Sequence, residues 1–156
     1  MTIQLSSTAF DEGQAVPKEH TADGRNSSPP LRWQDAPTGT GSWALICEDP
    51  DAPRGTFTHW VLYNLPAATR ELPEGVTPEP TLPNGGLQGV NDFGKIGYGG
   101  PAPPRGKPHR YLFKLFALAQ PLDLQPGSTK GQLLTAMKGR VLGEGLLMGT
   151  YGRGGG

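Results

Sequence analysis

The sequence predicts a mostly β protein, an antiparallel β-sandwich with one or two short helices. Aromatic and β-branched residues gather in short runs, as strands require. The 17 prolines lie so densely along the chain that few stretches could form a long helix. The 24 glycines stand mostly between the apolar runs, where turns connect one strand to the next.

The central strands are predicted from three apolar runs at residues 42–48, 60–65 and 110–119. Each run is rich in β-forming residues and is closed by turn residues. Because side chains alternate across a strand, the second run and the histidine before it should place one set of residues on a common face. That set is His59, Val61, Tyr63 and Leu65. Weaker patterns predict further strands at residues 3–6, 31–33 and 145–151.

One helix is predicted near the C-terminal end, with Ser128 or Thr129 as its N-cap. Glycines at 139 and 143 bracket its end, which gives about three turns. Apolar residues recur at helical spacing: Leu133, Leu134, Met137 and Val141.

Length and charge set the organisation and the class of partner. The 156 residues predict one domain, residues 1–152, with a flexible glycine-rich tail at 153–156. Fourteen basic residues balance fourteen acidic ones, which argues against binding to nucleic acid. No run is long or apolar enough for a secretion signal or a membrane span, so we expect a cytoplasmic protein. We also expect it to be a monomer or a homodimer. Cys47 is the only cysteine, which excludes an internal disulfide, and we expect no bound metal or cofactor.

The first candidate site follows the first central strand, in the segment Asp-Pro-Asp-Ala-Pro at residues 49–53. Two carboxylates are held there by prolines that restrict the backbone. Such stiffness suits a binding site, although acidic residues before proline also form ordinary turns. His59 opens the next strand and could face the same end of the sheet.

The second candidate segment is a loop at residues 97–108, too rich in glycine and proline for sheet or helix. Its backbone N–H groups could face an anion, with added charge from Arg105 and Lys107. His109 and Tyr111 follow two residues apart and therefore share a face of the third central strand. If the strand ends are neighbours, the carboxylates and histidines form one mouth that suits a phosphate or a zwitterionic head group.

Together, DPDAP, the pair His59-Trp60 and GYGGPAPPRGKPHRY resemble the two signature regions of the phosphatidylethanolamine-binding protein family, which includes the Raf kinase inhibitor proteins. The resemblance covers nearly the whole chain, and the chain is similar to the compact bacterial members of the family. It implies a β-sandwich around a small anion pocket, with no catalytic residues established for the family as a whole. Carried over by position, the implied ligand-binding residues are Asp49, Asp51, Pro53, Phe57, His59, Ala102, Pro103, Pro104, His109 and Tyr111.

The expected function is therefore binding of a small anion, such as phosphate, a phosphoethanolamine-like group or a carboxylate. The resemblance adds a regulatory role of the kinase- or protease-inhibitor kind, with a protein partner. Three alternatives stay open: a hydrolase that uses a histidine and an aspartate as general acid and base, a zinc site formed by His59, His109 and a carboxylate, and an interaction module whose pocket is a relic.

Overall fold

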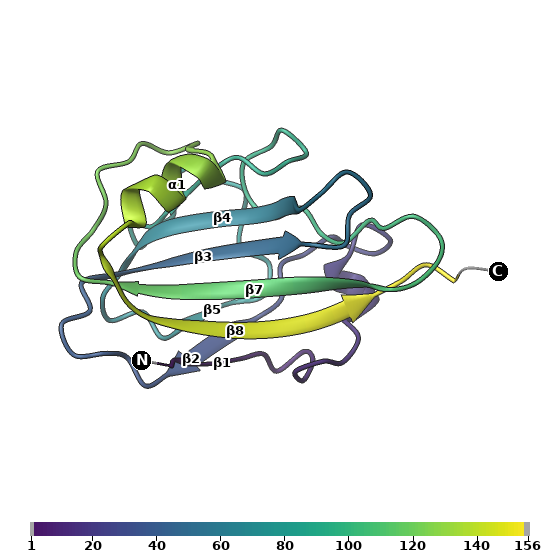
Figure 1. The fold of residues 1–156 in the computed structure, drawn as a ribbon, viewed down its shortest axis with the longest axis horizontal. Helices are drawn as coiled ribbons and strands as arrows, with labels where there is room; N and C mark the ends of the chain where they lie inside the picture. The colour runs from purple at the N-terminus through teal and green to yellow at the C-terminus, as the bar shows by residue number, and fades with distance from the viewer. Residues whose placement is uncertain (1, 155–156) are drawn as a thin grey trace.

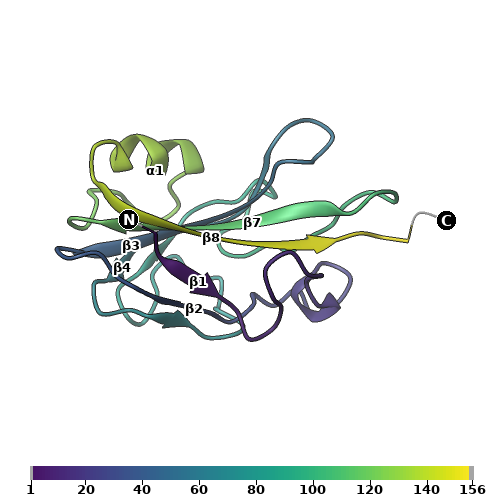
Figure 2. The same cartoon turned by 60° about the horizontal axis from the view of Figure 1, so that its bottom comes forward.

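The computed structural model describes residues 2–154 and consists mainly of two antiparallel sheets. The larger sheet has the strand order β6-β4-β3-β7-β8, and the smaller has the order β1-β2-β5. Figures 1 and 2 show the small sheet against one face of the large sheet and helix α1 on the other. The elements are β1 (Gln4–Ser6), the 3-10 helix η1 (Lys18–His20), β2 (Leu31–Gln34), β3 (Ser42–Asp49), β4 (Phe57–Pro66), β5 (Glu71–Leu72), β6 (Leu87–Gln88), β7 (His109–Leu118), α1 (Lys130–Met137) and β8 (Val141–Tyr151).

Strand β3 is buried on both faces, because it runs between the small sheet and α1. Trp43, Leu45 and Cys47 face the small sheet, where they join the main core. Ala44 and Ile46 alternate with them and pack beneath α1. A strand covered on both sides needs an unbroken apolar run rather than an alternating one, which explains why this segment stands out in the sequence. The predicted fold class is confirmed.

Helix α1 is shorter than its apolar spacing predicts. Thr129 caps it: the hydroxyl accepts a hydrogen bond from the Gln132 backbone, and the Gln132 side chain accepts one from the Thr129 backbone. Leu133 and Met137 bury against β3 and β4, and the helix ends at Met137. Gly139 then takes a left-handed φ of 75° that reverses the chain into β8. The assignment of Val141 to the helix is therefore wrong, since this residue begins β8.

Strand β4 does not keep a single alternation along its length. Asn64 has a positive φ of 54°, and the pairing with β3 shifts near this residue. The bulge moves Leu65 into the core between the sheets, whereas Val61 and Tyr63 pack under α1. The predicted common face is consequently wrong for Leu65.

The short elements and the C-terminal residues differ in part from the prediction. The short strands β5 and β6 were not predicted, and besides α1 the residues that the structure describes contain one single-turn 3-10 helix, η1. No helix among residues 2–154 is long and apolar enough to cross a membrane. Of the predicted flexible tail at residues 153–156, residues 155–156 lie outside the described residues, and Arg153 forms an ion pair with Asp23.

Candidate functional site

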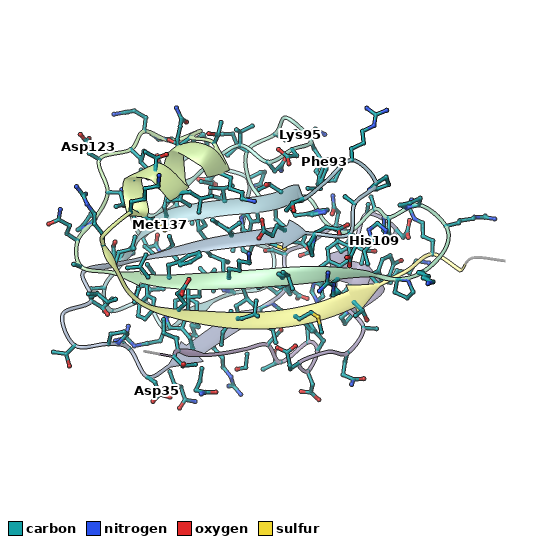
Figure 3. All side chains as sticks on the ribbon, viewed as in Figure 1. Asp35, Phe93, Lys95, His109, Asp123 and Met137 are labelled. Atoms are coloured by element: carbon teal, nitrogen blue, oxygen red, sulfur yellow. The ribbon has the colours of Figure 1, made fainter. Side chains whose placement is uncertain are left out.

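Three strand ends meet at one end of the large sheet. The register pairs Asp49, the last residue of β3, with Phe57, the first residue of β4. His109 begins β7, which pairs antiparallel with β3 on its other side. Antiparallel neighbours bring the end of one strand beside the start of the next, so distant segments of sequence gather here. Figure 3 labels His109 and Phe93 toward this end of the molecule.

A cavity of about 130 Å³ lies between these strand ends and the loops that follow them. It brings together every residue predicted for the site except Asp51. Its wall also includes two residues that the sequence argument missed. The lining residues are Asp49, Ala52, Pro53, Phe57, His59, Phe93, Ala102, Pro103, Pro104, His109 and Tyr111.

Asp49 holds the His109 ring in place. Its Oδ2 accepts a hydrogen bond of 2.6 Å from His109 Nδ1, and its Oδ1 accepts one of 2.7 Å from the Asp51 backbone N–H. Because the Nδ1 proton is bonded to the Asp49 carboxylate, His109 can form a hydrogen bond with a ligand only through Nε2. Asp49 itself is 3% exposed and uses both oxygens, so it is placed to orient a neighbour rather than to act as a free base.

A second bulge in β4 turns His59 into the cavity. Glu48 pairs with Thr58 and Cys47 with Trp60, which leaves His59 as an extra residue without a partner in β3. Its ring lies 5.3 Å from the Tyr111 ring, on the sheet face opposite to Val61. The predicted shared face of His59 and Val61 is therefore wrong, and the bulge is the reason.

The hydrogen bond of His59 fixes its tautomer. Nδ1 donates to the Gly99 carbonyl at 2.6 Å, which leaves Nε2 with a lone pair when the ring is neutral. Burial lowers the pKa of His59 below its ordinary value of 6.5, more than the backbone and the nearby acids raise it. At neutral pH this ring thus offers an acceptor and no charge.

Tyr111 is the least satisfied polar group of the cavity. The residue is 1% exposed, and its hydroxyl has no hydrogen-bond partner within residues 2–154. Burial raises the pKa of this phenol, so it stays protonated and can donate. A buried donor left unpaired costs about 1–3 kcal/mol, which makes it the group most in need of a ligand.

The loop that carries Ala102, Pro103 and Pro104 to the cavity is tied to the segment that follows η1. The Gly100 N–H donates to the Asn26 side chain at 2.7 Å, and the Pro101 carbonyl accepts from Ala22 at 2.9 Å. A Cβ on Gly100 would lie 2.5 Å from the Asn26 oxygen, so only glycine allows this approach. Arg153 adds a hydrogen bond of 3.1 Å to the Pro103 carbonyl.

Asp51 lies outside the cavity. Its carboxylate accepts hydrogen bonds from the backbone, Nε and Nη2 of Arg110, and these bonds lower its pKa to about 2. The pair is largely exposed, so Asp51→Ala should lower the free energy of unfolding by less than about 1 kcal/mol. We expect phosphate affinity within threefold of the unchanged protein, measured by calorimetry. A larger loss would place Asp51 among the ligand-binding residues after all.

Phe93 lines the cavity but was not predicted from the sequence. It lies in the turn after Asn91, where its ring packs edge-on against Phe57 with centroids 4.8 Å apart, and it remains 43% exposed. An isolated aromatic residue among turn-forming neighbours was the available signal, since loops seldom carry a large apolar side chain without a contact to make.

The rival zinc site receives no geometric support. Among residues 2–154, three metal-ligating side chains converge within 4.8 Å at Glu19, His20 and Glu74 and not at the two cavity histidines.

Comparisons with known proteins find matches that extend over almost the whole chain. Residues 6–152 match the family model of phosphatidylethanolamine-binding protein. A UPF0098 protein of Methanothermobacter thermautotrophicus is 49% identical over 152 residues, which cover 97% of this chain and 100% of the relative. A UPF0098 protein of Aquifex aeolicus is 47% identical over 153 residues, covering 97% and 89%.

Solved structures give the same result. YbcL of Escherichia coli, described as a member of the mammalian family, superposes with a TM-score of 0.90 at 33% identity and covers 97% of this chain and 98% of its own. A candidate homologue from Chlamydia trachomatis has a TM-score of 0.89 at 40% identity, with the same coverage. The chain belongs to the phosphatidylethanolamine-binding protein family.

Proposed function

We propose that the cavity binds a small anion of the phosphate class, either free or as the head of a larger molecule. The observation that carries the proposal is the unpaired, buried hydroxyl of Tyr111. A phosphate oxygen would accept its hydrogen bond, and His109, whose Nδ1 is held by Asp49, would face the same ligand through Nε2. The cavity of about 130 Å³ supports a head group rather than a whole lipid, because pockets for drug-sized molecules span about 300–1,000 Å³.

His59 adds a requirement on the ligand. Since its neutral Nε2 is an acceptor, the bound group should itself donate one hydrogen bond. Phosphate near neutrality keeps an O–H, whereas sulfate and an ionised carboxylate have none. A phosphoethanolamine group would instead bring its ammonium as the donor. This chemistry favours phosphate, or phosphate joined to an amine, over the carboxylates that the sequence also allowed.

At pH 7.5 we therefore expect calorimetry to give phosphate at least a tenfold higher affinity than sulfate, because sulfate would leave the His59 acceptor unpaired. As pH falls below 6.5, the lowered pKa of His59 is approached, its ring gains a proton, and Nε2 becomes a donor. Sulfate affinity should then rise and the preference should shrink. Equal affinities at pH 7.5, or a preference that grows on acidification, would contradict the proposal.

The source of the phosphate is decided by further titrations. Inorganic phosphate, phosphoethanolamine and vesicles that contain phosphatidylethanolamine would be compared, with phosphatidylcholine vesicles as control. Binding of the first two without vesicle binding supports a soluble ligand, and specific vesicle binding supports a lipid head group. Failure of all three would overturn the assignment of the cavity as an anion site.

The family resemblance alone supports a regulatory role through a protein partner, and the sequence alone supports a cytoplasmic monomer or homodimer. No observation favours the hydrolase alternative, because both oxygens of Asp49 are already bonded. Light scattering would settle the oligomeric state, and an ester panel without turnover would exclude the hydrolase.

A further inference from the structure

A second cluster of chemically capable side chains lies where η1 meets the turn after β5. Glu19 and His20 belong to η1, and Glu74 follows β5. The His20 side chain is 1% exposed, whereas those of Glu19 and Glu74 are 44% and 45% exposed. One buried nitrogen thus faces two carboxylates that reach solvent.

The hydrogen bond made by His20 defines which atom faces the carboxylates. Nδ1 lies 2.8 Å from the Ser27 carbonyl, which can only accept, so Nδ1 carries a proton. Nε2 is buried and has no hydrogen-bond partner among residues 2–154. A histidine that donates one N–H to a backbone carbonyl and presents the other nitrogen is the usual arrangement of a metal ligand.

Distances favour a metal ion over a proton between these groups. Nε2 lies 3.5 Å from the nearer oxygen of Glu74 and 3.9 Å from that of Glu19. A charge-assisted N–H···O bond would be about 2.7–2.9 Å long. By contrast, ligands that bind zinc tetrahedrally at about 2.1 Å stand roughly 3.4 Å apart. The observed separations are thus close to those of a metal site before the ion draws its ligands together.

The backbone around the cluster is already organised. The Gly75 N–H donates to the Ser28 carbonyl and the Val76 N–H to the Ser28 hydroxyl, each at 2.9 Å. These bonds join the turn that carries Glu74 to the segment after η1. Arg25 holds the second oxygen of Glu19 at 2.7 Å, which leaves the first oxygen directed toward His20. Pre-organised ligands reduce the entropy that an ion would have to overcome.

We propose that Glu19, His20 and Glu74 form a binding site for a divalent transition metal ion, with zinc as the matching probe. One imidazole and two carboxylates suit zinc better than calcium or magnesium, which prefer oxygen ligands alone. Three protein ligands on a partly exposed site leave room for water at the remaining position. Bound metal would join η1 to the turn after β5.

The test is a zinc titration of the full chain, stripped of metal beforehand, against a chromophoric chelator. We expect one zinc ion per chain, with affinity reduced at least tenfold in Glu74→Gln and in Glu19→Gln. Glu71→Gln is the matched control, because Glu71 is an exposed carboxylate only three residues from Glu74 and lies outside the cluster. Its zinc affinity should be unchanged. Thermal melts without zinc verify that all three variants remain folded.

Nuclear magnetic resonance of the histidine rings locates the ion independently. The chain has three histidines, so each ring can be followed separately. Zinc should shift the ring signals of His20 and leave those of His59 and His109 unchanged. Zinc that shifts the cavity histidines instead, affinity that is equal in both glutamine variants and the control, or no binding at millimolar zinc would overturn the proposal.

Discussion

Asp49→Ala is expected to abolish measurable phosphate binding, a loss of at least about 100-fold, and to lower the free energy of unfolding by about 2–4 kcal/mol. The substitution removes the acceptors of two hydrogen bonds, one from His109 Nδ1 and one from the Asp51 backbone. The His109 ring, which is largely buried, would be left with an unpaired donor and a free orientation. Urea denaturation would measure the stability, and calorimetry the affinity.

The direction of the binding effect separates two roles of Asp49. If the carboxylate acted only through its charge, its removal from the cavity wall would strengthen the binding of an anion. If it orients His109, its removal weakens binding despite that gain. Asp51→Ala serves as the control, because it deletes a carboxylate two residues away that points to Arg110. Tighter phosphate binding by Asp49→Ala than by the unchanged protein would refute the orienting role.

The sheet was predictable because its central strands are the most apolar parts of the chain. Strand β3 is buried throughout and therefore reads as a continuous run, and β7 alternates as a strand with one partly covered face should. Strands β5 and β6 are two residues long and carry no such pattern. Their pairing depends on β2 and β4 being in place, which is information from the tertiary structure.

The residues that line the candidate cavity were largely predictable from the sequence, whereas the directions of their side chains were not. The two signature segments identified nearly all of the cavity wall, because antiparallel pairing makes neighbours of the end of β3 and the start of β7. The alternation rule assigned His59 to the wrong face, since the bulge beside Cys47 inserts one residue into β4. No local feature of the sequence marks that insertion. A bulge that redirects a side chain is common next to functional sites.

Asp51 shows a second limit of sequence reasoning. Asp49 and Asp51 lie on either side of Pro50 in the sequence, yet only Asp49 lines the cavity. The backbone N–H of Asp51 donates to Asp49, so the turn closes on itself and directs the second carboxylate outward to Arg110. Position within a motif therefore does not determine the direction of a side chain when a turn intervenes.

Tyr111→Phe should raise the stability of the unliganded protein and lower its affinity for phosphate. Phenylalanine keeps the ring, including its edge contact with His59, and deletes only a buried hydroxyl that has no partner among the described residues. Removing such a group should raise the free energy of unfolding by about 1 kcal/mol. The same deletion removes a donor to the anion, which is worth about 1.5–3 kcal/mol, or roughly 10- to 100-fold in affinity.

Tyr63→Phe is the matched control, because Tyr63 is equally buried and its hydroxyl is satisfied. It donates to the Gln125 carbonyl and accepts from the Ser128 backbone N–H. The same chemical change should there lower the free energy of unfolding by about 1–2 kcal/mol and leave phosphate affinity unchanged. Opposite signs of the two stability changes, with loss of binding only in Tyr111→Phe, are what a hydroxyl kept for a ligand requires. Equal destabilisation in both variants would mean that the Tyr111 hydroxyl stabilises the fold, and the anion would then need another donor.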